Sequence, residues 1–386
     1  MGSGARRWMS LVMLLGLGAM ASGAPASGGV ATAYFYKPPL DGTTAQFIAR
    51  HFTLVILTEN DQGYARQLRR DGYRGLILQS VDGGEVEGPG PYWRRPRHCD
   101  CNYRPYQYSL ADQRGMFCRQ INGHEAWFLH DLEGRRILSR FRSAGGIERT
   151  NYAMNPAARG WRRFAARRLK ADRRLGFDGV FLDNIALSRA GWLGKVAGAK
   201  GVREFATGAA WRRAMAGYLD YLRGALGSEA IWANLTHDPG TADAWRRYLP
   251  ALNGVMVEDF LLGWRSYALP VAAREAQMIK VRRALAAGRS VLLVAQGGRR
   301  QGQRLRAALA GYWLLRPRPG AAGHLYFRYA DANDLAYRTV WWYPLYTRSP
   351  GAPRGPARRV GAVWRRRFAA GWVRLNMATL SARLAP

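Results

Sequence analysis

Two acidic residues stand where strand-like apolar runs end. Asp183 closes the run from Gly179, and Glu258 follows Val255 to Val257. A pair of carboxyl groups can cleave a glycosidic bond, because one protonates the leaving oxygen while the other attacks the sugar or activates water. Carboxyl groups at strand ends also bind cations or cap helices, so neither acid is diagnostic alone. Together they predict catalysis if the two strand ends meet.

The two acids have different sequence settings. Asp183 precedes Asn184, whose amide could bond a sugar hydroxyl beside an ionised carboxylate, and this suits a nucleophile. Glu258 has Met256 and Phe260 nearby, and apolar surroundings raise a carboxyl pKa and suit a general acid. We therefore predict a retaining reaction with carboxyl groups about 5 to 5.5 Å apart, whereas about 6.5 to 9.5 Å would indicate inversion.

Other side chains near strand ends could bind the same ligand. Neutral amides both donate and accept hydrogen bonds, and aromatic rings offer flat apolar faces to sugar rings. The predicted binding residues are Tyr34, Tyr36, Glu59, Gln79, Asn155, Asn184, Asn234, Asp259, Trp264 and Gln296, with Trp341 and Trp342 as further aromatic candidates. We expect neither a cofactor nor a metal ion. The motifs of competing hydrolases are missing, since the chain carries no nucleophile elbow, P-loop or H-E-x-x-H motif.

Short strand-like runs alternate with longer helix-like stretches along the chain, which is typical of βα units around a parallel sheet. Eight candidate strands predict an α/β fold, a (β/α)8 TIM barrel, whose active site lies at the carboxyl ends of its strands. The predicted strands are 31–36, 54–58, 75–79, 150–154, 179–183, 231–235, 255–258 and 290–296. The predicted helices are 43–51, 62–71, 156–175, 205–226, 271–288 and 302–315.

The ends of the chain and one long connection lie outside this repeat. Arg6 and Arg7 precede an apolar run from Trp8 to about Met20 and then small residues, which predicts a signal peptide and export to the periplasm or the medium. No later run is long enough to predict a membrane span. The expected organisation is a signal peptide (1–26), a barrel (27–320) with a loop insertion (82–146), and a small C-terminal β extension (321–386).

All three cysteines, Cys99, Cys101 and Cys118, fall within the predicted insertion. In an exported protein they predict one local disulfide and one free thiol. Neighbouring histidines leave a zinc site open as the alternative, although the Cys-x-Cys spacing matches no standard finger. These histidines are His98, His124 and His130.

Charge and composition narrow the function further. The 386 residues include 59 Lys and Arg against 26 Asp and Glu, a formal net charge of +33, and their 48% hydrophobic content excludes general disorder. The basic residues are spread over predicted helix faces without a nucleic-acid recognition motif, so specific nucleic-acid binding is not favoured. An anionic polysaccharide or envelope surface fits better. A cationic glycan would be repelled, so the predicted substrate is a neutral or anionic polysaccharide.

Three segments carry a resemblance to a known family: residues 176–184 (Gly-Phe-Asp-Gly-Val-Phe-Leu-Asp-Asn), 151–156 and 367–376. They resemble hypothetical glycosyl hydrolase family 15, a bacterial barrel family distinct from the glucoamylases and more distantly similar to the endo-α-1,4-polygalactosaminidases. The resemblance implies a glycoside hydrolase with Asp183 as the strand-end acid and Glu258 as the acid on a later strand. The competing hypothesis is a non-catalytic glycan-binding or envelope-associated barrel.

Overall fold

Eight parallel strands form the central sheet of the molecule, in the order β1-β2-β3-β7-β8-β9-β10-β11. The computed structural model describes residues 28–105, 109–142, 148–172, 175–189, 201–235, 242–263, 268–331 and 337–385. The strands are β1 (Ala33–Tyr36), β2 (Leu54–Thr58), β3 (Leu76–Asp82), β7 (Gly179–Asp183), β8 (Ala230–Asn234), β9 (Gly254–Val257), β10 (Ser290–Gln296) and β11 (Leu325–Ala330). The predicted (β/α)8 barrel is confirmed.

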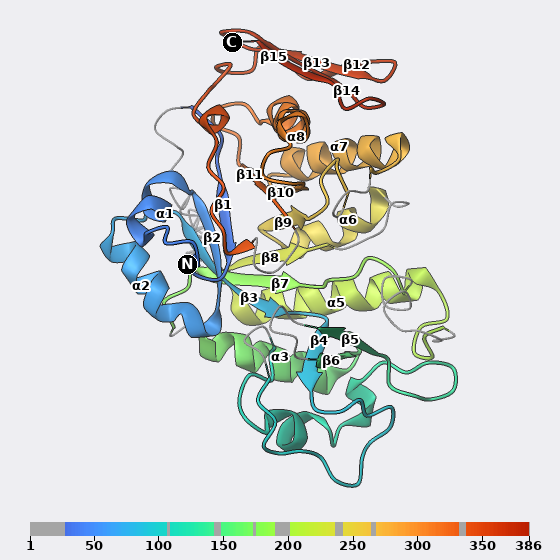
Figure 1. The fold of residues 1–386 in the computed structure, drawn as a ribbon. Helices are drawn as coiled ribbons and strands as arrows, with labels where there is room; N and C mark the ends of the chain where they lie inside the picture. The colour runs from blue at the N-terminus through green and yellow to red at the C-terminus, as the bar shows by residue number, and fades with distance from the viewer. Residues whose placement is uncertain are drawn as a thin grey trace, which may run out of the picture.

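The first and last strands of this sheet meet beside each other. A single parallel bridge joins Thr32, just before β1, to Phe327 of β11. The backbone N–H of Phe327 also donates to the carbonyl of Ala31 at 2.8 Å. This seam brings the sheet close to a complete barrel, with β1 and β11 adjacent in Figure 1.

Helices surround the barrel and follow most of its strands (Figure 1). They are α1 (Ala45–His51), α2 (Gln62–Arg70), α3 (Arg159–Asp172), α5 (Gly208–Leu226), α6 (Ala242–Tyr248), α7 (Val271–Ala286) and α8 (Gly302–Leu315). Thr44 and Thr207 cap α1 and α5 by accepting from backbone N–H groups, and Gly227 ends α5 with a φ of 64°. All but the seven-residue α6 match predicted helices.

The barrel interior is filled by every second residue of its strands, because side chains alternate between the faces of a sheet. Phe181, Trp232, Met256 and Leu292 belong to one buried cluster inside the barrel. Gly254 leaves room for this packing, since a Cβ atom there would lie 2.4 Å from the Trp232 ring. The same alternation turns the residues that end these strands toward the mouth.

The predicted strand at 150–154 is not part of the barrel. It corresponds to β6 (Glu148–Ala153), which pairs antiparallel with β4 (Glu85–Gly88) and β5 (Leu138–Arg142) in a separate sheet. The eighth barrel strand is instead β11, which the sequence placed in the C-terminal extension. A short apolar run indicates a strand but carries no information about its partner, and this explains the exchange.

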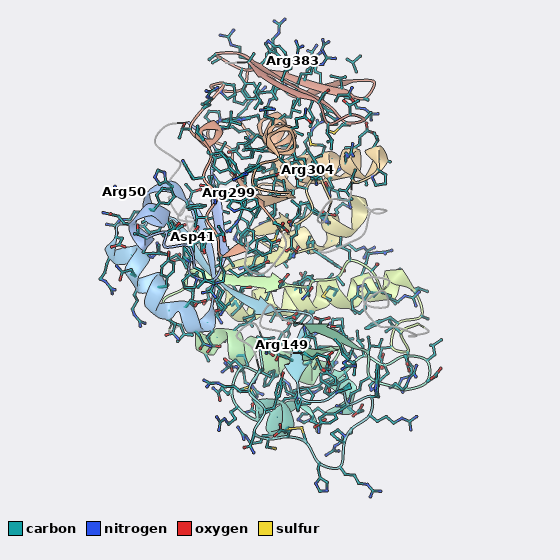
Figure 2. The ribbon with its side chains drawn as sticks, in the orientation of Figure 1. Asp41, Arg50, Arg149, Arg299, Arg304 and Arg383 are labelled. Atoms are coloured by element: carbon teal, nitrogen blue, oxygen red, sulfur yellow. A yellow bond between two sulfur atoms is a disulfide. The ribbon has the colours of Figure 1, made fainter. Side chains whose placement is uncertain are left out.

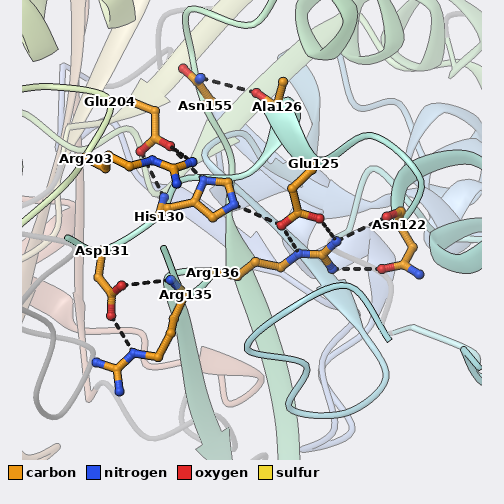
Figure 3. A network of polar contacts seen from close by, with 10 residues as sticks. All are labelled: Asn122, Glu125, Ala126, His130, Asp131, Arg135, Arg136, Asn155, Arg203 and Glu204. Atoms are coloured by element: carbon orange, nitrogen blue, oxygen red, sulfur yellow. Dashed lines mark hydrogen bonds and ion pairs between the residues drawn. The ribbon is translucent and has the colours of Figure 1, made fainter. Parts of the chain in front are cut away.

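The long connection between β3 and α3 is held together covalently and by ion pairs. Cys99 and Cys118 form a disulfide and Cys101 is an exposed free thiol, as the first interpretation of the cysteines predicted. Buried His130 lies 2.7 Å from Glu204 and 2.9 Å from Glu125 (Figure 3). Burial opposes its charge, but hydrogen bonds to the two carboxylates outweigh burial and raise its pKa.

Arg136 is the buried centre of the same network (Figure 3). Its guanidinium donates to Glu125 at 2.5 and 2.9 Å and to Asn122 at 2.8 Å, and it lies 3.8 Å from the centre of the Phe128 ring. Replacing Arg136 with methionine should lower the free energy of unfolding by about 2 to 3 kcal/mol, because Glu125 and Asn122 lose their shared donor. Urea unfolding followed by tryptophan fluorescence measures the loss.

Arg135 provides the matched control for this prediction. Its side chain is 37% exposed and pairs with Asp131, whose buried carboxylate also accepts hydrogen bonds from the backbone N–H groups of Glu133 and Arg135. We expect Arg135→Met to cost less than about 1 kcal/mol, because an exposed guanidinium contributes little and Asp131 keeps its backbone donors. Equal losses in the two variants would show that burial of Arg136 has no special role in stability.

The C-terminal residues form a separate antiparallel sheet that packs on α8 at one end of the molecule (Figure 1). Its strands are β12 (Arg358–Val360), β13 (Val363–Arg367), β14 (Trp372–Asn376) and β15 (Ala382–Ala385). Trp364, Val373 and Leu375 are buried on its inner face. None of the helices in the described ranges has the length and apolar character needed to cross a membrane.

Candidate active site

Three neighbouring strand ends bring Asp183 and Glu258 together. Asp183 ends β7, Asn234 ends β8 and Glu258 directly follows β9, so one strand separates the two acids. The Asn234 Nδ2 donates to Asp183 Oδ1 at 2.9 Å and to Glu258 Oε2 at 2.7 Å. The distance between the two acceptor oxygens therefore cannot exceed the sum of these two hydrogen-bond lengths.

Glu258 is set up to hold a proton near neutral pH. Burial raises its pKa most, and the nearby Asp183 carboxylate adds to the shift, giving a pKa of about 8. Hydrogen bonds from Asn234 and from the Tyr337 hydroxyl, 3.2 Å from Oε1, act in the opposite direction. Gln296 Nε2 donates to the Glu258 carbonyl and to the Tyr337 hydroxyl, both at 2.9 Å, and fixes this arrangement.

Two donors contact Oδ1 of Asp183. Besides Asn234, the backbone N–H of Asn184 donates to its Oδ1 at 2.9 Å. Asn184 has a φ of 55°, a left-handed conformation that asparagine tolerates better than most residues. Its Nδ2 in turn donates to Asp82 Oδ2 at 3.3 Å, which links the end of β3 to the site.

Aromatic and cationic side chains complete the interior beneath the acids. Tyr36 packs against Phe181 and Tyr337, and its hydroxyl faces the Met256 sulfur at 3.9 Å. Buried Arg328 of β11 donates to the carbonyl of Tyr337 at 2.5 Å and so supports the segment that presents the tyrosine hydroxyl to Glu258. Tyr36, one of the predicted binding residues, thus lies in the barrel interior beside the residues that support the two acids.

Three predicted binding residues lie away from this mouth. Tyr34 is fully buried on the outer side of the barrel, where its hydroxyl donates to the Lys37 carbonyl. Gln79 is buried on the side of β3 that carries Ile77, whose side chain packs among the helices. Asn155 follows β6 in the long connection between β3 and α3 and donates to the Ala126 carbonyl (Figure 3). The sequence identified strand ends but not which face each residue occupies.

Four of the remaining candidates contact other side chains of the protein, and one lies outside the described residues. Glu59 lies 3.8 Å from Arg168 of α3, and Asp259 accepts a 2.9 Å hydrogen bond from Gln277 of α7. Trp341 and Trp342 pack on other aromatic side chains of the protein, near Tyr329 and Phe47 respectively. Trp264 lies outside the described residues.

Sequence reasoning missed Tyr337, Arg328 and Asp82. Tyr337 lies in no strand and reaches Glu258 only through the tertiary fold. Arg328 is a charged residue inside a barrel strand, where an apolar residue is expected. Asp82 gave the clearest signal, because it is the last residue of β3 just as Asp183 is the last residue of β7.

The arrangement combines a carboxyl group that holds a proton with a second carboxyl group fixed beside it by the shared donor Asn234. Such a pair can transfer a proton to a leaving oxygen and supply a nucleophile or a base at the same centre. Within the described residues, no group of three or more His, Cys, Asp or Glu side chains is placed to hold a metal ion.

The model of hypothetical glycosyl hydrolase family 15 matches residues 100–372. No curated protein matches the chain. The glycoside hydrolase domain of PelA from Pseudomonas aeruginosa is 17% identical, with a TM-score of 0.46, over 81% of this chain and 100% of that one. The α-galactosidase TtGalA from Thermus thermophilus is 14% identical, with a TM-score of 0.47, over 92% and 67%. Ega3 from Aspergillus fumigatus, in complex with galactosamine, is 12% identical, with a TM-score of 0.41, over 82% and 95%.

Proposed function

Because the chain belongs to hypothetical glycosyl hydrolase family 15, we propose that it is an exported enzyme that hydrolyses glycosidic bonds in a neutral or anionic polysaccharide. Asp183 and Glu258 are its two catalytic carboxyl groups. The observation that carries this assignment is the double hydrogen bond from Asn234, which joins both acids at the mouth of the barrel.

The raised pKa of Glu258 supports the role of general acid. Protonated Glu258 gives its proton to the glycosidic oxygen as Asp183 attacks the anomeric carbon, so the leaving group departs as an alcohol and a glycosyl–enzyme ester forms. Glu258, now ionised, then takes a proton from water as that water attacks the ester. The second step releases Asp183 and restores the proton on Glu258.

Other features support the finer parts of the proposal. The basic and apolar residues at the N-terminus favour export, and the Cys99–Cys118 disulfide suits an oxidising compartment. The net charge of +33 disfavours a cationic substrate and favours a neutral or anionic one. Tyr36, Asn184 and Gln296 are the binding residues we place nearest the cleaved bond.

We predict that the released sugar first appears with the anomeric configuration of the substrate. Two oxygens that share one donor nitrogen fit the carboxyl spacing of about 5 to 5.5 Å typical of retaining enzymes. Proton NMR during the first minutes of hydrolysis, on a substrate chosen from a panel of neutral and anionic polysaccharides, distinguishes the two outcomes. Initial inversion would contradict the proposed nucleophile, and binding without turnover across the panel would favour a non-catalytic glycan-binding barrel.

A further inference from the structure

The C-terminal sheet carries one arginine from each of its four strands in a single row. Cross-strand pairing aligns them directly, and we call them the arginine row: Arg358, Arg365, Arg374 and Arg383. All four are exposed, and Figure 2 shows Arg383 on this outlying sheet. The opposite face of the sheet, with Trp364 and Val373, is buried against the body of the protein.

This alignment works against stability. Like charges placed directly opposite each other on neighbouring strands are destabilising. Between residues 335 and 386 the sequence contains no Asp or Glu at all, and in the described parts of the chain no carboxylate pairs with the arginine row. The row is therefore not explained by ion pairs within the protein.

Two other arginines of the same sheet make contacts within the protein that stabilise the fold. Arg359 points to the opposite side and pairs with Glu275 of α7 at 2.8 Å. Arg366 is buried and donates to backbone carbonyls at the end of α8, including that of Leu314 at 3.1 Å. With the residues that the structure describes, the arginine row makes neither kind of contact, which leaves its guanidinium groups available to an external anion.

An exposed aromatic side chain lies on the same face as the arginine row. Trp372 is 40% exposed, pairs across the sheet with Arg367 and precedes Arg374 by two positions on β14. Residues two apart on a strand share a face, so the indole stands beside the row. A flat apolar ring next to guanidinium groups suits a sugar ring that carries a negative charge.

We propose that this face of the C-terminal sheet binds an extended anionic polysaccharide, with its acidic groups on the arginine row and one sugar ring on Trp372. Neighbouring strands are about 4.8 Å apart, a spacing comparable to one sugar ring of an extended chain. It is also shorter than the screening length of about 8 Å at physiological salt, so the arginines attract a polyanion jointly. This surface lies on β12 to β15, apart from the strands that carry Asp183 and Glu258. Its proposed role is to hold the polymer, which is distinct from cleaving it.

Binding is tested in the full chain carrying Asp183→Asn, so that a bound polymer is not cut and the outcome does not depend on hydrolysis. Polygalacturonate and dextran sulfate serve as probes, with unsubstituted dextran as the neutral reference, in calorimetric titrations. Arg365→Gln with Arg374→Gln should weaken binding of the anionic probes at least about tenfold, since two charge-assisted contacts are lost. Trp372→Ala should weaken it several-fold.

The matched control is Arg163→Gln with Arg167→Gln, which removes the same charge from an exposed face of α3. We expect the affinity of this control for the anionic probes to change less than twofold. The variant with Arg365→Gln and Arg374→Gln should melt at a temperature at least equal to that of the parent, because repulsion between like charges is relieved. Equal weakening in the control would reduce the effect to net charge and overturn the proposal. Failure of both anionic probes to bind, or tighter binding of single-stranded DNA or phosphatidylglycerol vesicles, would also overturn it.

Discussion

Asparagine in place of Asp183 should lower kcat on a cleavable polysaccharide by at least about a thousandfold, because the amide cannot form the glycosyl ester. The side chain keeps its shape and one oxygen, so the hydrogen bond from Asn234 can persist and substrate should still bind. Reducing-end release gives kcat, and titration with the uncut polymer gives the affinity. A large fall in kcat with little change in affinity is the expected result.

Two comparisons separate a nucleophile from a merely structural acid. Asp259→Asn removes a nearby carboxylate that accepts from Gln277 of α7, and we expect it to cost less than about tenfold. In Asp183→Ala, added azide should restore turnover of an activated aryl glycoside by replacing the missing nucleophile. Equal losses at Asp183 and Asp259, or no rescue by azide, would contradict the assignment.

Glu258→Gln should reduce kcat/KM on a natural polysaccharide by about 10²- to 10⁴-fold, the usual contribution of a general acid. The loss should be much smaller on an aryl glycoside whose leaving group needs no proton. The acid works only when protonated, so wild-type activity should fall as pH rises through the Glu258 pKa of about 8. This alkaline limb should be absent from the residual activity of the variant. Near-normal turnover in Glu258→Gln, with loss in Asp259→Asn, would move the acid to Asp259.

The same carboxyl group links stability to pH. Its pKa is about 8 in the folded protein and about 4.3 in an unfolded chain, so folding favours the protonated form. The stability contributed by this proton is complete below about pH 4.3 and is lost as pH approaches 8. The melting temperature of Glu258→Gln should therefore rise relative to the wild type over that interval. If the difference in melting temperature between variant and wild type stayed the same from pH 4 to pH 9, this would argue against a buried acid.

The strand ends of the barrel were readable because apolar runs end sharply. Asp183, Asn234 and Gln296 all close such runs and all reach the mouth. Gln79 met the same criterion but occupies the outer face, as does the aromatic candidate Tyr34, since only every second residue of a strand points inward. Proximity to a strand end therefore predicts a site residue only together with the face.

The partners of strands were not readable. Residues 150–154 and 325–329 both have a strand-like composition, yet β6 pairs with β4 and β5 in a separate sheet and β11 completes the barrel. Periodicity reports the local conformation, whereas pairing depends on contacts between distant segments. Tyr337 shows the same limit within the site, because it contacts Glu258 from a segment with no local pattern of its own.

The seam between β1 and β11 determines when the fold can be completed. The partners Thr32 and Phe327 lie at nearly opposite ends of the chain, and contacts of such long sequence separation form slowly. Until β11 has been synthesised, β1 and β10 each keep an unpaired edge, and bare edges of this kind promote aggregation. A polypeptide that stops before Leu325 would carry both edges permanently. The barrel can therefore close only after β11 has been synthesised, because β1 has no partner at the seam until then.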